Sequence, residues 1–209
     1  CLLSRGLGDV YKRQDEGGGL FIEYSSPMIR NSKISNSFAE SKGGGFFVGA
    51  QSNPKFENCI FESNGLSNNG DRVNDGGNGY LEEGSISMSN CTVQSGYAQT
   101  SGAGLKFYNA TGEVLLINCT FNLNSISSNS GSGGAISSYG SSILMVEECL
   151  FSSNYGRSSG GAIHFSGGIL EVLKSEFISN TSNSNNNNNG GGGIRSVSYT
   201  HLTLPTKRI

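Results

Sequence analysis

The chain repeats itself, because three short patterns recur in the same order about every 29 residues. The first is a glycine pair followed by alternating apolar residues, as in Gly133 to Ile136. The second is a pair of apolar residues separated by one position, such as Leu144 and Val146. The third is a Cys-x-Phe-x-x-Asn phrase, as in Cys149 to Asn154. The cysteine position recurs at residues 32, 59, 91, 119, 149 and 175, with serine in the first and last copies, and so defines six repeats.

Each of these patterns has a period of two, and none has the 3.6-residue spacing of a buried helical face. The elements are therefore strands. A composition with 34% apolar residues and 32 glycines would be typical of disorder if the apolar residues were not so regular. A unit of this length with three strands cannot bury its own apolar face and must stack on its neighbours. The sequence predicts an all-β fold, a right-handed parallel β-helix (a pectate-lyase-like solenoid) of about six coils with three short strands each.

The two ends of the chain do not share the repeat. Residues 1–14 and 197–209 hold few of the Gly, Asn and Ser residues that fill the middle, and they resemble translated adapter DNA at the ends of proteins from environmental sequencing. We predict that both segments are non-native and that 15–196 is a repeat domain, part of a longer polypeptide. Without the ends, 9 basic and 15 acidic residues leave a net charge of −6, against −2 for the whole chain. An acidic body without a basic stripe argues against nucleic acid as a partner.

Stacked coils place like residues above one another at a spacing of roughly 4.8 Å. The inward parity slips by one before the cysteine position, which predicts a corner, and asparagine tolerates the left-handed conformation that a corner requires. Three structural columns are therefore expected. They are an asparagine ladder of Asn31, Asn58, Asn90 and Asn118, a cysteine column of Cys59, Cys91, Cys119 and Cys149, and a phenylalanine column of Phe61, Phe121, Phe151 and Phe177.

The cysteine column has three interpretations. We favour buried free thiols that act as small apolar side chains. Disulfides between neighbouring coils and a metal site are the alternatives. Parallel stacked side chains disfavour a disulfide, and no CxxC pair or nearby histidine supports a metal.

The sequence shows no catalytic cluster. His164 alternates with apolar neighbours in a strand and is expected to face outward, while His201 lies in the atypical C-terminal segment. Acidic residues gather around the loop from Gly65 to Asp75, where a calcium site is the alternative to solvated surface charge. The acidic residues concerned are Asp71, Asp75, Glu82 and Glu83. We therefore expect no catalytic residue, no metal or other cofactor, and no enzyme activity.

The glycine phrase at Gly133 to Ile136 and Gly160 to Ile163, together with four Phe-x-x-Asn phrases, resembles the repeats of chlamydial polymorphic outer membrane proteins and related β-helix surface proteins of bacteria and protists. The resemblance covers about 180 residues, and it lies in the order and repetition of short motifs. It implies a surface-displayed, adhesin-like or passenger-like region. The location that it implies is extracellular or at the cell surface, associated with the outer membrane if the source is bacterial.

Loops of variable length follow each Phe-x-x-Asn phrase and are expected to emerge along one edge of the stack. We predict that this edge binds a host or environmental glycan or a surface protein, with Tyr97, Tyr155 and Arg157 as contact residues. One alternative is a carbohydrate-binding or polysaccharide-cleaving β-helix, of the lyase or hydrolase type, with its active coils outside this fragment. A further alternative is a structural spacer. No run of apolar residues is long enough to span a membrane.

Overall fold

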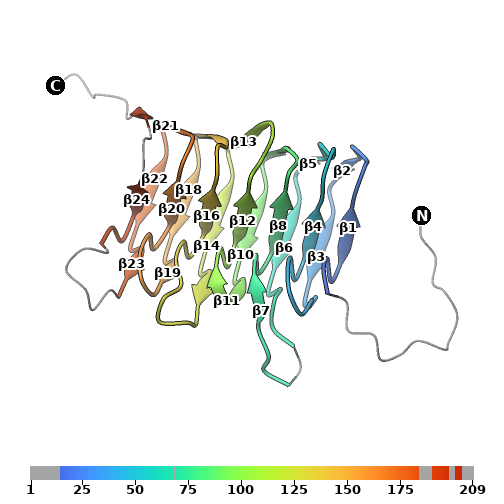
Figure 1. Cartoon of the computed structure of the whole chain (residues 1–209), viewed down its shortest axis with the longest axis horizontal. Coiled ribbons are helices and arrows are strands. Elements are labelled where there is room, and N and C mark those ends of the chain that lie inside the picture. The colour runs from blue at the N-terminus through green and yellow to red at the C-terminus, as the bar shows by residue number, and fades with distance from the viewer. Residues whose placement is uncertain (1–14, 68, 184–189, 198–200, 204–209) are drawn as a thin grey trace, which may run out of the picture.

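The computed structural model describes residues 15–67, 69–183, 190–197 and 201–203, and these residues form strands and turns without any helix. The strands stack side by side into a solenoid, from blue N-terminal coils to red C-terminal coils (Figure 1). All paired strands in the described part of the chain run parallel, and each is in register with the equivalent strand of the next coil. The parallel β-helix predicted from the repeat is confirmed.

The strands form four sheets, which we number in the order in which the chain enters them. Sheet 1 contains β1 (Leu20–Ile22), β4 (Phe46–Val48), β8 (Gly79–Glu82), β12 (Leu105–Tyr108), β16 (Ile136–Tyr139), β20 (Ile163–Ser166) and β24 (Ile194–Val197). Sheet 2 contains β2 (Met28–Arg30), β5 (Lys55–Glu57), β9 (Ile86–Ser89), β13 (Glu113–Ile117), β17 (Ile143–Glu147), β21 (Ile169–Leu173) and β25 (His201–Thr203).

The remaining two sheets complete each coil. Sheet 3 contains β3 (Lys33–Ser35), β6 (Ile60–Glu62), β10 (Thr92–Gln94), β14 (Thr120–Asn122), β18 (Leu150–Ser152) and β22 (Glu176–Ile178). Sheet 4 contains β7 (Val73–Asp75), β11 (Tyr97–Ser101), β15 (Ser125–Ile126), β19 (Tyr155–Gly156) and β23 (Thr181–Ser182). Complete coils therefore carry four strands where the sequence predicts three. Several strands of sheet 4 have two residues, too few to display an apolar alternation.

The core is a set of apolar columns that run along the solenoid axis. In sheet 3 the Phe121 and Phe151 rings stack with centroids 4.7 Å apart, and the Phe151 and Phe177 rings stack at 4.8 Å. Phe61 lies apart from this stack, because Val93 occupies the position between Phe61 and Phe121 in the register. Phe61, Phe121 and Phe151 are fully buried, whereas Phe177, in the last strand of sheet 3, is partly buried. Full burial of each such ring contributes about 2 kcal/mol to stability.

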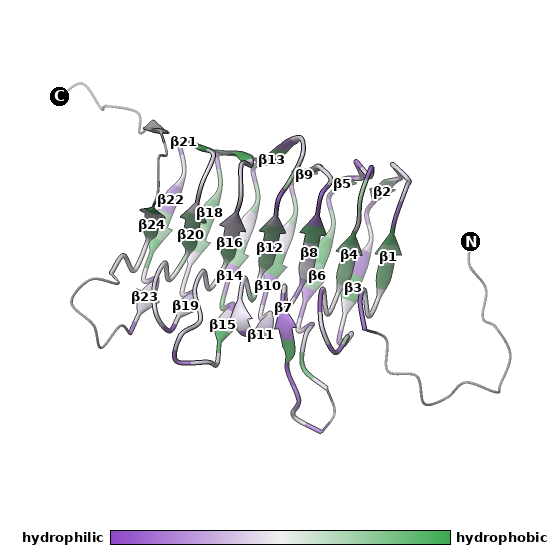
Figure 2. Cartoon of the chain, in the orientation of Figure 1, coloured by the Kyte–Doolittle hydropathy of each residue, from purple (hydrophilic) through white to green (hydrophobic). Residues whose placement is uncertain are grey.

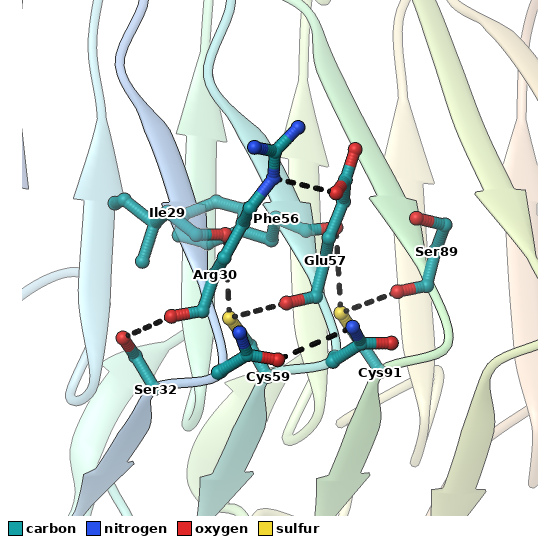
Figure 3. Close-up of polar contacts among 10 residues, drawn as sticks. Ile29, Arg30, Ser32, Phe56, Glu57, Cys59, Ser89 and Cys91 are labelled. Atoms are coloured by element: carbon teal, nitrogen blue, oxygen red, sulfur yellow. Dashed lines mark hydrogen bonds and ion pairs between the residues drawn. The ribbon is translucent and has the colours of Figure 1, made fainter.

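The cysteine column lies inside the solenoid as four buried free thiols. Each sulfur lies against two backbone carbonyls, one two residues earlier and one in the preceding coil. Cys59 Sγ, for example, lies 3.3 Å from the oxygen of Glu57 and 3.5 Å from that of Ile29 (Figure 3). Ser32 occupies the same position in the first coil, and its hydroxyl donates to the oxygen of Arg30 at 2.8 Å. The column thus supplies weak hydrogen-bond donors at a corner as well as apolar volume.

The predicted asparagine positions lie at the corner between sheets 2 and 3. Asn31, Asn58, Asn90 and Asn118 have φ between 50° and 53°, and all four are exposed. Asn58 Nδ2 donates to Asn31 Oδ1 at 3.2 Å, and Asn118 Nδ2 donates to Asn90 Oδ1 at 2.7 Å. The next two coils carry the same backbone conformation with other side chains, since Glu148 and Lys174 have φ of 55° and 48°. We call these six residues the corner column.

A second asparagine ladder, which the sequence analysis did not identify, runs through the interior at the corner between sheets 3 and 4. It consists of Asn64, Asn78, Asn124, Asn154 and Asn180, and we call it the buried column. The first four are completely buried. Each of the five amides donates one hydrogen bond to a backbone carbonyl, and the first four donate a second to the Oδ1 of the next asparagine, over 2.8 to 3.1 Å.

One residue of the buried column comes from outside the Phe-x-x-Asn phrase. The third copy of the phrase has Gly96 where the others have asparagine, and Asn78, at the start of β8, fills the gap. A Cβ on Gly96 would lie 2.6 Å from the Asn78 amide nitrogen. Glycine is therefore required at residue 96, because the side chain of Asn78 already occupies that space.

The atypical ends are described only in part. The predicted non-native segment 1–14 lies outside the described residues. Of the predicted segment 197–209, Val197 ends β24 and β25 pairs with β21, while the rest lies outside the described residues. The proposed origin of these ends stays a prediction.

Candidate functional site

The predicted recognition residues come together on the outer face of sheet 4. Tyr97 is in register with Ser125, and Ser125 is in register with Tyr155, so the two tyrosines lie in one row with a small residue between them. Two strand spacings separate them, about 10 Å along the axis. Arg157 lies two residues after Tyr155, in the bend that follows β19. All three predicted contact residues are partly exposed.

Two arginines accompany this row. The Arg72 guanidinium carbon lies 5.7 Å from the centroid of the Tyr97 ring, a cation–π distance. Arg157 Nη1 donates to Asn129 Oδ1 at 2.7 Å, which holds the side chain along the edge. The Nε of Arg157 is buried and has no hydrogen-bond partner in the described residues. We call Arg72, Tyr97, Ser125, Tyr155 and Arg157 the sheet 4 row.

Polar loops emerge beside this row. The loop between β6 and β7 folds back on itself through an antiparallel bridge between Leu66 and Arg72 and projects from the stack (Figure 1). Strand β7, which follows it, is mostly hydrophilic, in contrast to the hydrophobic β1 and β4 of sheet 1 (Figure 2). The tyrosines of the sheet 4 row therefore lie beside polar loops and stay partly exposed.

The middle strands of sheet 1 are covered on both faces. Their outward row consists of Phe47, Tyr80, Lys106, Ser137 and His164, which are in register from coil to coil and at most 5% exposed. Phe21, the corresponding residue of β1, is 48% exposed. The segment just before each glycine turn covers this row. Its residues Lys42, Asp75, Ser101, Ser132 and Ser159 are joined in turn by parallel bridges. The middle strands of sheet 1 are thus buried on their outer side as well, beneath a mostly polar segment.

The interpretation of His164 has to be corrected. Its side chain does lie opposite the core residues of β20, but it is 4% exposed and does not face solvent. Ser159 Oγ lies 3.0 Å from Nδ1 of His164, and the Tyr139 ring lies against the imidazole with centroids 5.3 Å apart. Burial, together with the charges of Arg195 and Lys106, lowers the pKa of His164 to about 4. The imidazole is therefore neutral and enclosed at pH 7.

Lys106 is the chemically unusual residue of this covered row. It is 5% exposed, and its Nζ lies 3.7 Å from the centroid of the Tyr139 ring and 3.5 Å from Ser137 Oγ. Burial lowers its pKa to about 8, although the charge of Asp75 opposes the shift. This residue was not predicted from the sequence. The pattern that could have indicated it is a lysine between two apolar residues at the centre of a strand.

Two of the four acidic residues predicted around the loop from Gly65 to Asp75, namely Glu82 and Asp75, have protein partners. Lys42 Nζ lies 2.6 Å from Glu82 Oε2 and 3.1 Å from Glu16 Oε1. Burial disfavours the charged form of Lys42, but these carboxylates outweigh it and raise the pKa of the lysine. Asp75 Oδ1 accepts hydrogen bonds from the hydroxyls of Thr100 and Ser101. No group of three or more His, Cys, Asp or Glu residues in the described ranges could hold a metal ion, so the alternative calcium site has no cluster to support it.

A search of the described residues for membrane-spanning helices found none with the necessary length and apolar character.

Stacked parallel strands, interior ladders and a row of exposed side chains define the chain as a β-solenoid repeat protein. Comparison with protein families gives a match over residues 9–121 to the family described as right handed beta helix region. The match covers more than half of the 209 residues, and the chain therefore belongs to this family. The right-handed β-helix predicted from the repeat is thereby confirmed. Searches of curated proteins and of solved structures found no match. The finer resemblance to chlamydial polymorphic outer membrane protein repeats stays a prediction.

Proposed function

We propose that the chain is a non-enzymatic recognition segment of a secreted or cell-surface protein and that its sheet 4 row binds a glycan or a surface protein. The observation that carries the proposal is the alignment of Tyr97 and Tyr155 in one exposed row, with Arg72 and Arg157 beside them. Tyrosine and arginine are the residue types that contribute most often to binding energy at protein surfaces.

The chemistry of the row favours a carbohydrate as the first ligand class to test. A tyrosine ring offers an apolar face that packs against sugar C–H groups and a hydroxyl that reaches their oxygens. The partly exposed guanidinium of Arg157 can donate to a sugar hydroxyl or a carboxylate. Because the row is held on a stacked scaffold, little side-chain entropy would be lost on binding.

The repeat resemblance to chlamydial surface proteins supports an extracellular or cell-surface location, associated with the outer membrane if the source is bacterial. Variable polar loops beside a rigid row are also typical of recognition surfaces, since their length can change without disturbing the core. Adhesin-like attachment is therefore the activity that we propose.

A glycan and extracellular-matrix array screened with the folded full-length chain tests the proposal. The informative variant is the double substitution Tyr155→Ala and Arg157→Ala, which should weaken binding by about tenfold or more. Tyr108→Ala is the matched control, since Tyr108 is 42% exposed on sheet 1 and should have no effect. Equal loss of binding in the double variant and in Tyr108→Ala would show that binding does not depend on the sheet 4 row. Failure of the folded chain to bind any component of the array would favour the alternative of a structural spacer.

Polysaccharide cleavage is a second candidate, and Lys106 is the observation that favours it. A lysine with a pKa near 8 is partly neutral at pH 8 and can accept a proton from a sugar carbon next to a carboxylate. Elimination would then break the bond to the glycosidic oxygen, which takes up a proton from water, and leave a carbon–carbon double bond in the sugar. The 5% exposure of Lys106 weighs against substrate access. Incubation with polyuronates, followed by ultraviolet absorbance of unsaturated products, tests this candidate, with Lys106→Met as the inactive control.

A further inference from the structure

The outer face of sheet 2 divides into two chemically different halves. On the first three strands its outward residues are mostly charged or small and polar, and Arg30 Nε lies 2.7 Å from Glu57 Oε2. On β13, β17 and β21 the outward residues are mostly apolar. The apolar patch consists of Leu115, Ile117, Ile143, Met145, Ile169 and Leu173. Ile143 is in register with Ile169 and Leu115 with Met145, while Glu147 lies between Ile117 and Leu173.

The patch is open to solvent. Ile143 is 41% exposed and Ile169 is 44% exposed, and the other four side chains are partly exposed. An outward sheet position on the solvent side of a coil normally carries a polar residue, as the first half of this face does. Six apolar side chains grouped on three adjacent strands form a continuous surface, and such a surface is typical of a binding site rather than of scattered exposure.

The charges within the patch indicate the chemistry of its partner. Three carboxylates occupy the remaining outward positions of the same strands, at Glu113, Glu147 and Glu171. Lys174 Nζ lies 3.5 Å from Glu147 and 3.2 Å from Glu148, which neutralises part of this charge. No lysine or arginine in the described part of the chain forms an ion pair with Glu113 or Glu171. The patch therefore presents apolar area together with uncompensated negative charge.

A hollow marks one border of the patch. It has a volume of about 400 Å³, and its lining includes the small residues Ser85, Ser87 and Gly112. Ser87 lies between the larger Lys55 and Leu115 in the register. Glu113 and Leu115 line its patch side and Lys55 lines the other. A side chain that enters this hollow would contact the carboxylate of Glu113 while its neighbours pack on the apolar patch.

We propose that the apolar patch on sheet 2 is a docking surface for a cationic, apolar polypeptide segment of a partner protein. The mixture of six apolar residues and three carboxylates on adjacent strands matches an extended segment whose patch-facing side chains, at every second position, include both Leu-like and Lys-like ones. A second copy of the chain fits less well, because pairing two such patches would bring their carboxylates together without compensating cations. An anionic membrane surface is excluded by the same charges. This surface lies on a different sheet from the sheet 4 row, and it is independent of the function proposed above.

Fluorescence anisotropy tests the proposal, with the chain titrated into a labelled peptide in which leucine and lysine alternate at every second position and serine lies between them. We expect saturable binding that weakens as salt increases, and no binding of the matched leucine–glutamate peptide. The triple substitution Ile143→Ser, Met145→Ser and Ile169→Ser should weaken binding by about tenfold or more. Met28→Ser with Ile178→Ser is the matched control, since both residues are exposed and lie outside the patch.

A charge test separates the patch from general attraction to an acidic protein. The double substitution Glu113→Gln and Glu171→Gln should weaken binding by about threefold or more. Glu23→Gln with Glu83→Gln removes the same net charge from exposed positions elsewhere and should leave binding unchanged. All substitutions lie on outer faces, and circular dichroism verifies the fold.

Three outcomes would overturn the proposal. They are failure of the leucine–lysine peptide to bind, equal binding by the patch and control variants, and self-association in sedimentation velocity that the triple substitution abolishes. The last result would assign the patch to a second copy of the chain.

Discussion

Two columns of residues turn corners in this solenoid, and they differ in what they require of the sequence. The corner column, between sheets 2 and 3, is exposed and accepts Asn, Glu and Lys as long as φ is near 50°. The buried column, between sheets 3 and 4, keeps an asparagine side chain at five levels, and at one level that side chain comes from a different segment.

The difference follows from solvent access. An exposed corner needs a residue that tolerates the left-handed conformation, and water satisfies whatever polar groups it leaves unpaired. A buried corner has no water, so its backbone N–H and C=O groups must be bonded by a side chain with both a donor and an acceptor. Asn124 fulfils this need. Its Oδ1 accepts from Gly96 N and Asn78 Nδ2, and its Nδ2 donates to Val93 O and Asn154 Oδ1.

Removing a residue of the buried column should have the largest effect. Asn124→Leu keeps a similar volume but removes four hydrogen bonds from the interior. We expect a loss of about 3 to 5 kcal/mol in the free energy of unfolding, measured by urea denaturation followed by circular dichroism. Asn118→Ala, in the corner column, is the matched control and should cost about 1 kcal/mol. Similar losses in the two variants would show that the columns are equivalent.

The gap filled by Asn78 gives the second test. Gly96→Ala would place a Cβ 2.6 Å from Asn78 Nδ2 and against the backbone oxygen of Ala103. We expect a loss of about 2 kcal/mol by the same urea measurement, because backbone has to move. Gly190→Ala is the control, since a Cβ there meets nothing within 4 Å. A neutral Gly96→Ala would mean that Asn78 is not held in place.

Leu123 offers a test of the opposite kind, in which a substitution next to the buried column should raise stability. It lies just before the buried column with φ of 55° and is 54% exposed, so it carries backbone strain without burying its side chain. Leu123→Asn should raise the free energy of unfolding by about 1 kcal/mol, since asparagine tolerates this conformation better. Thermal denaturation of the two proteins at one concentration measures the gain, and a lower midpoint in the variant would contradict the argument.

The smallest effect is expected within the corner column. Glu148→Asn exchanges one tolerated corner residue for another and loses an exposed ion pair with Lys174. We expect the free energy of unfolding to change by less than about 0.5 kcal/mol in paired urea titrations. A loss of 2 kcal/mol or more would show that this column depends on side-chain identity after all.

The sequence predicted the fold class well because apolar residues at every second position, repeated six times, are compatible with few other structures. It did not reveal sheet 4 as strands, since β15, β19 and β23 are too short to show a period. The sheet 4 row was predicted from loop position, and the structure places Tyr97 and Tyr155 in one row.

Other features could not be obtained from the sequence alone. The buried column was missed because Gly96 interrupts the Phe-x-x-Asn series, and only the three-dimensional arrangement brings Asn78 into the gap. The enclosure of His164 and Lys106 depends on a preceding segment that folds over the outer side of sheet 1, and alternation along β12 and β20 says nothing about that cover. The apolar patch depends on which strands become neighbours across coils.

The buried column also has a direction. The first four amides donate toward the later coil and accept from the earlier side, so the five side-chain dipoles are aligned head to tail. Insertion or deletion of one whole repeat therefore leaves each remaining interior amide with a neighbour on both sides, whereas insertion of half a repeat would interrupt the chain of dipoles. Genes for such solenoids can gain and lose complete units by recombination at little structural cost, and the interior asparagines set the unit in which those changes are tolerated.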